Sequence, residues 1–370
     1  MENVLPLFSN PFLLGLFAIV TGFGLAYKIL PVIIFLAHKK NLMDEPKKRS
    51  AHLKKLPNLG GVGIFIAITI SITVFGSLIE LVLPQFKQLL VLFGAITILF
   101  FLGLKDDLTG LSYIKKFGGQ TIAACLVVLL TDIRISNFGG LFGIYELPYF
   151  ISVLFSILLF VYLINAFNLI DGIDGLAGSI AIVSCSIFGL FFLLNGHALL
   201  ALVSLSMIGA LVGFLKYNLS KSPKKLFMGD SGSLFIGFLL CYQAIAFINA
   251  PSIEAISVSN KLIIALAVLS IPTLDTLRIF IIRIAHRRSP FTADRNHIHH
   301  RLLDLGLTHK QATLLLIAVN LLIITVALLV GGLNINYQFL IVISFVPIIC
   351  LFPYFIARQG SQFKFVLPTL

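Results

Sequence analysis

Long apolar segments alternate with short polar ones along the whole chain. An apolar run of about 17–25 residues is long enough to cross the ~30 Å hydrocarbon core of a bilayer as a helix. Helices satisfy their own backbone hydrogen bonds there, which open strands cannot do. The pattern predicts an all-α, polytopic transmembrane helical bundle of about eleven spans, at residues 11–37, 59–83, 88–104, 117–131, 149–167, 176–194, 198–215, 232–249, 261–283, 312–331 and 336–357.

The composition supports the same fold class. Of the 370 residues, 58% are hydrophobic and 11% are charged, whereas soluble domains carry roughly 25% charged residues. No polar segment is long enough to form a soluble domain, so we expect a single integral membrane domain over residues 1–370. The four cysteines lie in apolar runs without a Cys-x-x-Cys pair, which is typical of buried side chains and not of a disulfide framework or zinc site.

Positive charge lies almost entirely on one side of the expected spans. Of the 27 Lys and Arg residues, 22 lie in four of the segments between spans, with their edges, and in the C-terminal tail, and the opposite side has Lys87, Arg134 and Lys261. Because Lys and Arg concentrate in cytoplasmic loops, we expect the N-terminus outside and the C-terminus in the cytoplasm. The expected cytoplasmic loops are 38–58, 105–116, 168–175, 216–231 and 284–311. A net charge of +12 placed in this way indicates membrane anchoring, and we expect no nucleic-acid partner.

Two adjacent carboxylates, Asp106 and Asp107, follow the third apolar segment in the sequence Gly-Leu-Lys-Asp-Asp. Neighbouring carboxylates at a membrane boundary repel each other unless a cation or a proton offsets their charge. Mg²⁺ is suited to this position because it binds one or two carboxylates together with phosphate oxygens. A solvated helix end with Lys105 as counter-ion explains the same pair equally well.

A turn with two more aspartates joins the fifth and sixth apolar segments, in the sequence Asn-Leu-Ile-Asp-Gly-Ile-Asp-Gly (residues 168–175). The glycine after each aspartate lets the backbone approach a ligand closely. The following helix would direct its positive N-terminal end at whatever binds there. Helix capping needs one carboxylate, whereas this turn holds Asp171, Asp174 and Asn168, and we therefore favour a functional interpretation.

The eighth apolar segment opens with Phe-Met-Gly-Asp-Ser-Gly-Ser (residues 227–233). Asp230 and Ser231 are suitable helix caps. Small residues at a helix N-terminus also form a cradle for phosphate, with Ser231 and Ser233 as contacts. The capping and phosphate-binding roles are compatible.

The longest loop on this side contains Asp-Arg-Asn-His-Ile-His-His-Arg (residues 294–301). His297, His299 and His300 do not lie on one helical face and no cysteine is near, which argues against zinc. Histidines beside Arg295 and Arg301 suit the binding of a diphosphate and proton transfer near neutral pH.

Two further groups have a structural explanation of their own. Asp275 and Arg278 lie three residues apart in an apolar segment, which favours an intramembrane ion pair over a role in a site. His52 and Lys55 lie in segment 38–58, where charge anchoring and phosphate contact are both open.

Taken together, these motifs resemble those of the polyprenyl-phosphate N-acetylhexosamine-1-phosphate transferases (glycosyltransferase family 4), which include the phospho-MurNAc-pentapeptide translocase. Asp-Asp, Asn-x-x-Asp-Gly-x-Asp-Gly, Gly-Asp-x-Gly-Ser-Leu and a histidine-rich last loop follow one another in the family's order. In the peptidoglycan branch the last loop has a sequence similar to His-His-His-Phe-Glu, whereas this chain has His-Ile-His-His-Arg there. This difference favours the bacterial undecaprenyl-phosphate GlcNAc-1-phosphate transferase branch.

The resemblance implies a reaction and its setting. A UDP-sugar, with UDP-GlcNAc favoured, and undecaprenyl phosphate would give undecaprenyl-diphospho-sugar and UMP, as the initiating step of a cell-envelope polysaccharide. The reaction would use Mg²⁺, with Mn²⁺ as a substitute, at the cytoplasmic face of a bacterial inner membrane. Membrane lipids and a second copy of the chain in a homodimer are the other expected partners.

The resemblance also assigns residues to roles. The catalytic positions are Asp106, Asp107, Asp171, Asp174, His297, His299 and His300. We expect the metal on Asp230 and Asp107, and the nucleotide on Asn168, Asn218 and Phe227. The phosphate cradle and the basic loops add substrate contacts at Ser231, Ser233, Arg295, Arg301, His52 and Lys55.

Two other functions share part of this pattern. A transporter for a phosphorylated or nucleotide-linked solute would also have around eleven spans, but its polar residues should lie near the bilayer midplane and its sequence should repeat. Neither feature is visible in this chain. A CDP-alcohol phosphotransferase would continue Asp-Gly-x-x-Ala with Arg, whereas Asp174-Gly175-Leu176 is followed directly by Ala177 and then Gly178.

Overall fold

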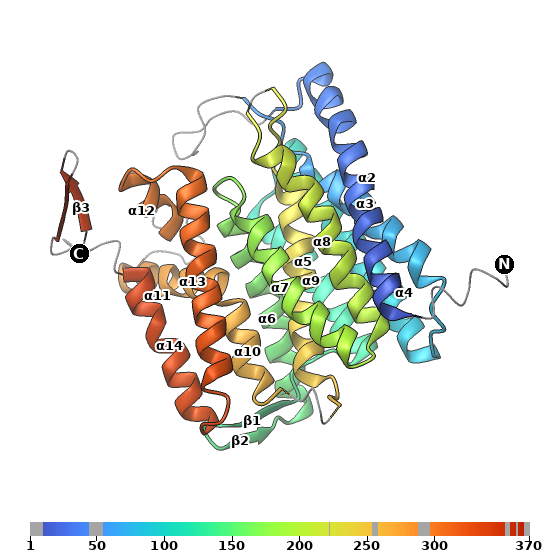
Figure 1. Cartoon of the computed structure of the whole chain (residues 1–370), viewed down its shortest axis with the longest axis vertical. Helices are drawn as coiled ribbons and strands as arrows, with labels where there is room; N and C mark the ends of the chain where they lie inside the picture. The colour runs from blue at the N-terminus through green and yellow to red at the C-terminus, as the bar shows by residue number, and fades with distance from the viewer. Residues whose placement is uncertain are drawn as a thin grey trace.

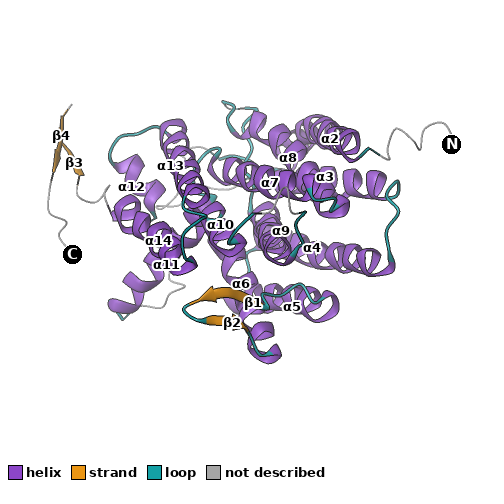
Figure 2. Ribbon diagram, turned by 60° about the horizontal axis from the view of Figure 1, so that its bottom comes forward, coloured by secondary structure: helices purple, strands orange, loops and turns teal. Residues whose placement is uncertain are grey.

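The computed structural model describes residues 10–43, 55–221, 223–253, 258–287, 297–351, 356–359 and 362–365, with side chains as far as residue 345. Within these residues the chain forms a bundle of helices with two short antiparallel hairpins (Figures 1 and 2). The helices are α2 (Pro11–Lys40), α3 (Gly60–Gly76), α4 (Leu83–Thr109), α5 (Tyr113–Thr131), α6 (Tyr149–Ile170), α7 (Leu176–Leu194), α8 (Ala198–Asn218), α9 (Asp230–Asn249), α10 (Lys261–Val268), α11 (Ser270–Ala285), α12 (Ile298–Asp304), α13 (His309–Leu329) and α14 (Ile335–Leu351). The hairpins pair β1 (Asn137–Leu141) with β2 (Ile144–Glu146), and β3 (Ile356–Gln359) with β4 (Gln362–Phe365).

The expected all-α, multi-pass membrane fold is confirmed. Each of the eleven apolar windows contains a helix or, in one case, a bent pair of helices. Among the described residues, eight helices are long and apolar enough to cross a membrane, and the bent pair α10–α11 would make nine. Helix α3 and the described part of α14 are apolar but shorter. The number of eleven spans and the orientation of the termini stay predictions.

The helices differ from the expected windows at three places. The window 261–283 is two helices, α10 and α11, which meet at Leu269 with a bend of 76°. Most of the expected loop 105–116 is helical, because α4 runs to Thr109 and α5 starts at Tyr113, so that only the turn around Gly110 separates them. The loop expected at 284–311 contains the short helix α12. Charged residues that were expected in the loops 105–116 and 284–311 therefore lie partly in helices.

Helix α9 is the centre of the bundle, and 94% of its apolar window is buried. In the end-on view it is surrounded by α3, α4, α6 and α7, all of which contact it (Figure 2). Glycines allow the closest of these contacts. A Cβ atom on Gly103 of α4 would lie 2.3 Å from the carbonyl oxygen of Asp230, and one on Gly61 of α3 would lie 2.1 Å from the backbone nitrogen of Gly232. The ends of α3 and α4 are thereby brought against the N-terminus of α9.

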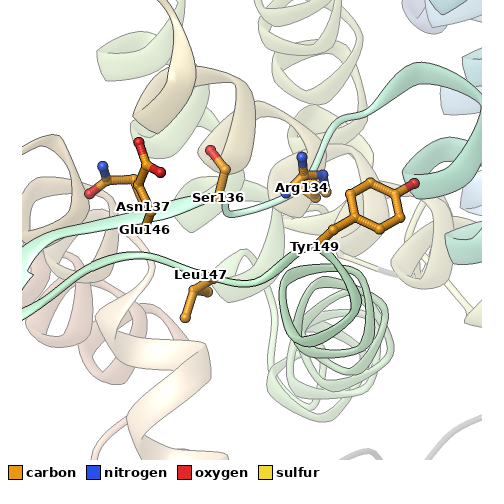
Figure 3. A pocket seen from close by; sticks show the side chains of 6 residues that line it. All are labelled: Arg134, Ser136, Asn137, Glu146, Leu147 and Tyr149. Atoms are coloured by element: carbon orange, nitrogen blue, oxygen red, sulfur yellow. The ribbon is translucent and has the colours of Figure 1, made fainter.

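The hairpin β1–β2 and the helix α12 lie at opposite ends of the bundle (Figure 1). A cavity of about 330 Å³ lies beside the hairpin (Figure 3). The charge of Arg134, which lines this cavity, has two partners within the protein. Its Nε lies 2.6 Å from Asp132 Oδ1, and its guanidinium lies 4.7 Å from the centre of the Tyr149 ring. This cavity belongs to the end of the molecule away from the sequence motifs, and its lining residues are Arg134, Ser136, Asn137, Glu146, Leu147 and Tyr149.

Candidate active site at the N-terminus of α9

Asp107, in the last turn of α4, holds the first turn of α9. Its Oδ1 accepts a hydrogen bond from the backbone N–H of Asp230, and its Oδ2 accepts one from Ser231, both at 2.9 Å. Backbone N–H groups in a first helical turn have no partner within their own helix. Asn58 adds a third contact, with Nδ2 3.3 Å from Oδ1 of Asp107. Asp107 therefore caps α9 from a neighbouring helix, which is also favoured by the helix dipole.

Lys116 of α5 connects two carboxylates that are far apart in the sequence. Its Nζ lies 3.0 Å from Oδ2 of Asp106 and also contacts Oδ2 of Asp230. The other oxygen of Asp106 accepts a hydrogen bond at 2.6 Å from the backbone N–H of Leu111, across the turn at Gly110. Two carboxylate oxygens thus face one cationic position, which the ammonium group of Lys116 fills.

Asn168, in the last turn of α6, completes this group of contacts. Its Nδ2 donates to Oδ1 of Asp230 at 2.8 Å and to Oγ of Ser233 at 2.7 Å. Four separate stretches of chain therefore meet at the start of α9. We call this group the acidic cluster: Asp106, Asp107 and Asp230, with Lys116 and Asn168.

Asp171 follows α6 directly and lies close to the acidic cluster. Burial raises the pKa of the Asp171 carboxyl well above its usual range, and the negative charges of Asp230, Asp107 and Asp174 raise it further. Because carboxylates have this effect only over short distances, the carboxyl of Asp171 lies near those of Asp230, Asp107 and Asp174.

Asp174 belongs to a second group of contacts beside the acidic cluster. Its Oδ2 contacts Nζ of Lys225 and lies 3.1 Å from Nδ1 of His309, the first residue of α13. Burial alone would raise the pKa of Asp174, but hydrogen bonds from His309 and Lys225 bring this pKa below its usual value. Lys225 also lies over the ring of Phe227, with 5.6 Å between Nζ and the ring centre.

Asn218, the last residue of α8, ties the turn after Asp174 to the loop before α9. Its Oδ1 accepts a hydrogen bond from Gly175 N–H at 2.6 Å, and its Nδ2 donates to the carbonyl of Leu226 at 3.0 Å. Gly175 has φ 79°, a left-handed conformation that glycine adopts without strain. Asn218 and Phe227, both expected to contact the nucleotide, are thereby placed beside Asp174.

His297, His299 and His300 form the histidine cluster, which is buried against the same turn. The rings of His297 and His299 stack with their centres 5.6 Å apart, and those of His299 and His300 lie 4.3 Å apart. A Cβ atom on Gly172 would lie 2.3 Å from Nε2 of His299, so this ring rests on the backbone between Asp171 and Ile173. Burial, and next the neighbouring His300, lower the pKa of His299 to about 3, and its ring is therefore neutral near neutral pH.

The remaining expected substrate contacts lie at the periphery or outside the described residues. Arg301 is partly buried in α12, next to the histidine cluster. Lys55 is exposed and precedes Pro57, whose carbonyl accepts a hydrogen bond from Phe227 N–H at 2.9 Å. His52 and Arg295 lie outside the residues that the structure describes.

Several residues of the site are not evident from the sequence. Lys116 and Lys225 resemble the other positive charges that anchor this membrane face, and Asn58 and His309 belong to no motif. Each of them contacts an aspartate of the motifs. The one available signal is the glycine turn at Gly110, which folds Lys116 back toward the Asp-Asp pair.

The acidic cluster fits Mg²⁺ by the chemistry of its donors. This ion commonly takes one or two carboxylates and completes its octahedron with phosphate oxygens and water. Asp106 and Asp230 already direct one oxygen each at a shared cation, the ammonium group of Lys116. No group of three or more His, Cys, Asp or Glu in the described part of the chain could hold a metal ion by itself, so substrate oxygens would have to contribute. Both oxygens of Asp107 accept backbone hydrogen bonds, and its role as a metal ligand stays a prediction.

Comparison with known proteins identifies a matching family and several relatives of this chain. Residues 89–248 match the model of the family described as glycosyl transferase family 4. The chain is 31% identical over 290 residues to the probable undecaprenyl-phosphate N-acetylglucosaminyl 1-phosphate transferase of Bacillus subtilis, covering 78% of this chain and 77% of the relative. It is 31% identical over 320 residues to the decaprenyl-phosphate N-acetylglucosaminephosphotransferase of Mycolicibacterium smegmatis, covering 81% and 76%. For the undecaprenyl-phosphate alpha-N-acetylglucosaminyl 1-phosphate transferase of Escherichia coli K12, identity is 28% over 337 residues, covering 89% and 88%.

Proposed function

Because the chain belongs to glycosyl transferase family 4, we propose that it transfers N-acetylglucosamine 1-phosphate from UDP-GlcNAc to undecaprenyl phosphate, giving undecaprenyl-diphospho-N-acetylglucosamine and UMP. The names of the relatives support the donor group and a polyprenyl phosphate acceptor. The observation that carries the proposal is the convergence of Asp106, Asp107, Asn168 and Asp230 at the start of α9. The product would start the synthesis of a cell-envelope polysaccharide.

The proposed location is the cytoplasmic face of a bacterial inner membrane. The acceptor phosphate is tethered to a long apolar chain, whereas the donor is a soluble anion, so the two meet at the boundary between bilayer and water. The acidic cluster lies at the ends of α4 and α6 and at the start of α9, where such a boundary is expected. The excess of Lys and Arg in the segments on this side supports the cytoplasmic assignment.

The proposed reaction is a displacement at phosphorus. An oxygen of undecaprenyl phosphate attacks the β-phosphorus of the donor, which bears the sugar, and the bond from this phosphorus to the bridging oxygen breaks to release UMP. Both reactants are anions, so positive groups must offset their repulsion and stabilise the charge on the leaving group. Mg²⁺, or Mn²⁺ in its place, would supply this charge when held by Asp230 and Asp106.

The residues of the acidic cluster have distinct roles in this proposal. Lys116 contacts Asp106 and Asp230, and from this position its ammonium group can move to a phosphate oxygen. Asn168 orients the carboxylate of Asp230, and Asp107 keeps the first turn of α9 in place. A general base is not required, because the acceptor phosphate is largely ionised at neutral pH.

The second group of contacts is assigned to the nucleotide. Phe227 offers an aromatic face beside Asp174, and Lys225 lies between them with its positive charge. Asn218 holds the two loops that carry these residues. The uridine would bind on the Phe227 side, with its diphosphate directed toward the acidic and histidine clusters.

The test is a donor panel with purified protein in detergent. UDP-GlcNAc, UDP-GalNAc and UDP-MurNAc-pentapeptide are each supplied with undecaprenyl phosphate and Mg²⁺, and UMP release is measured together with the mass of the lipid product. We expect UMP and a lipid of the mass of undecaprenyl-diphospho-GlcNAc from UDP-GlcNAc, and neither in EDTA. Uptake of a nucleotide-linked solute into vesicles without any lipid product would instead favour the transporter.

A further inference from the structure

Asp275 makes contacts beyond the ion pair expected from the sequence. It lies in the second turn of α11, just after the bend between α10 and α11, and it is 1% exposed. Its Oδ1 accepts a hydrogen bond from Arg278 Nη2 at 2.8 Å, and its Oδ2 lies 2.9 Å from Nδ1 of His297. The backbone N–H of Ile298, the first residue of α12, donates to the same carboxylate at 3.2 Å and 3.4 Å. Asp275 therefore joins α11 to the start of the histidine cluster.

These contacts determine which ring nitrogen of His297 carries a proton. A carboxylate that receives hydrogen bonds from Arg278 and from the backbone of Ile298 is ionised and acts only as an acceptor. Nδ1 of His297 is therefore the donor. The other ring nitrogen, Nε2, is buried and has no hydrogen-bond partner among the described residues. A carboxylate on one ring nitrogen with the other left open is the arrangement that orients a histidine for contact with a substrate.

The ring of His297 is also connected to the site described above. It stacks on His299, with 13° between the ring planes, and His299 rests on Gly172 between Asp171 and Ile173. A continuous row of side chains thus runs from Asp275 in α11 through His297 and His299 to the turn that carries Asp171. A displacement of His297 would therefore disturb the contact of His299 with that turn.

We propose that Asp275 is a positioning residue for the histidine cluster, which holds His297 in the tautomer protonated at Nδ1 and thereby offers Nε2 to the phosphate groups of the substrate. The neutral ring accepts a hydrogen bond or a proton at Nε2. Once protonated, it donates from Nε2 to a phosphate oxygen while Asp275 stabilises its positive charge. The tautomer follows from the geometry alone, whereas its use on phosphate rests on the proposed function.

The tautomer is tested by NMR on the full-length protein with ¹⁵N-labelled histidine, in detergent at about pH 8, where a histidine of ordinary pKa is neutral. The chain has eight histidines, and the spectrum of His297→Gln identifies the signals of His297 by their loss. We expect a protonated Nδ1 and an unprotonated Nε2 in the wild type. In Asp275→Asn the amide group donates to Nδ1, so the Nε2-protonated form should replace it. The kcat should fall roughly 100-fold with little change in KM for UDP-GlcNAc.

Arg278→Gln is the matched control, because it alters the other partner of the same carboxylate and leaves the contact to His297. It should keep the Nδ1-protonated signal. If Arg278→Gln and Asp275→Asn changed the tautomer and kcat alike, Asp275 would be only one half of an ion pair, and the proposal would fail. Asp275→Glu keeps the carboxylate and should recover the wild-type signal and part of kcat.

The wild-type spectrum reports the tautomer of His297 and therefore tests the proposal even if the variants do not fold. A wild-type His297 protonated at Nε2 would overturn the proposal directly. If the spectrum shows the Nδ1-protonated form but the protein releases no UMP from any donor, the proposed function is wrong while the role of Asp275 in orienting His297 stands.

Discussion

Asp107 and Asp230 are both acidic residues of one cluster, yet their contacts differ. Asp107 uses both oxygens on backbone N–H groups of α9, whereas Asp230 directs its oxygens at Lys116 and Asn168. The two residues should therefore respond differently to the same substitution, although both are expected to be essential.

We predict that Asp230→Asn and Asp107→Asn both abolish turnover in folded protein. Asp230→Asn should leave the melting temperature nearly unchanged, because loss of the ion pair with Lys116 is offset by relief of the repulsion between Asp230 and Asp107, and Lys116 keeps its contact with Asp106. Asp107→Asn should also lower the free energy of unfolding by about 1 kcal/mol, since the amide retains only one acceptor for two N–H groups. UMP release and thermal unfolding in detergent measure the two effects. Full activity of both variants would remove these residues from the catalytic set.

His299 gives a prediction about pH. Its pKa is about 3 in the folded protein and about 6.5 in an unfolded chain. Between these values the unfolded chain binds more protons, so the contribution of His299 to stability decreases as the pH falls below 6.5. The wild type should lose more melting temperature between pH 7.5 and 5 than His299→Gln. An equal loss in both proteins would show that His299 is not buried as a neutral ring.

At the scale of single residues, the aspartates of the motifs could be predicted from the sequence, but the residues that contact them could not. Aspartates next to glycines are visible in a sequence, because their spacing along the chain is local. The contact of Lys116 with Asp230 joins residues 114 positions apart, and it depends on which helix ends meet. For the same reason the sequence indicates only Arg278 as a partner of Asp275, whereas His297 and Ile298 also contact it.

At the scale of elements, the close approach of α4 and α9 places the acidic cluster. The backbone of α4 at Gly103 lies against the backbone of Asp230, where a side chain would not fit. Gly94, in the same helix, has open space around it, since a Cβ atom there would meet nothing within 4 Å. These two glycines therefore form a matched pair for substitution.

We predict that Gly103→Ala moves the start of α9 and lowers both kcat and the free energy of unfolding, the latter by about 1–3 kcal/mol through overpacking. Gly94→Ala should keep full activity and be neutral or slightly stabilising, since alanine favours helix by about 1 kcal/mol. Thermal unfolding and UMP release are measured for both. Equal behaviour of the two variants would contradict the contact between α4 and α9.

The helices were predictable from apolar length alone, and the break between α10 and α11 was not. The apolar pattern continues through Leu269, so one window covers both helices. Pro272 is the available signal: it has no N–H to donate to the carbonyl of Val268, the last residue of α10. Helix α12 is too short and too polar for a window of this kind, and its position depends on the hydrogen bond from Ile298 to Asp275 of α11 and on its packing against α13.

At the scale of the whole molecule, the end of the bundle that carries the acidic and histidine clusters should face the opposite side of the membrane from the hairpin β1–β2 (Figure 1). In a variant without the four native cysteines, a cysteine at exposed Tyr145 in the hairpin should react with an impermeant maleimide on intact cells. A cysteine at exposed Lys221, before α9, should react only after the cells are opened. Labelling in the reverse pattern would place the site outside and rule out a cytosolic nucleotide donor.

The family and the general fold could be predicted from the sequence because composition and ordered motifs are properties of the whole chain. The arrangement of the acidic cluster, the contacts around Asp174 and the histidine cluster could not, since it depends on how the ends of α4, α6, α9 and α12 pack. According to the proposed function, these clusters together hold a nucleotide-sugar and a lipid phosphate so that phosphorus passes from one to the other.

The most direct test follows the phosphorus itself. UDP-GlcNAc labelled with ³²P in its β-phosphate is incubated with undecaprenyl phosphate, Mg²⁺ and the purified protein, and the label is followed into the lipid and aqueous phases. Transfer of a sugar 1-phosphate predicts that the label enters the lipid and that the released UMP is unlabelled, with no transfer by Asp230→Asn. Label that stays in water as UDP while the sugar enters the lipid would contradict the proposed transfer.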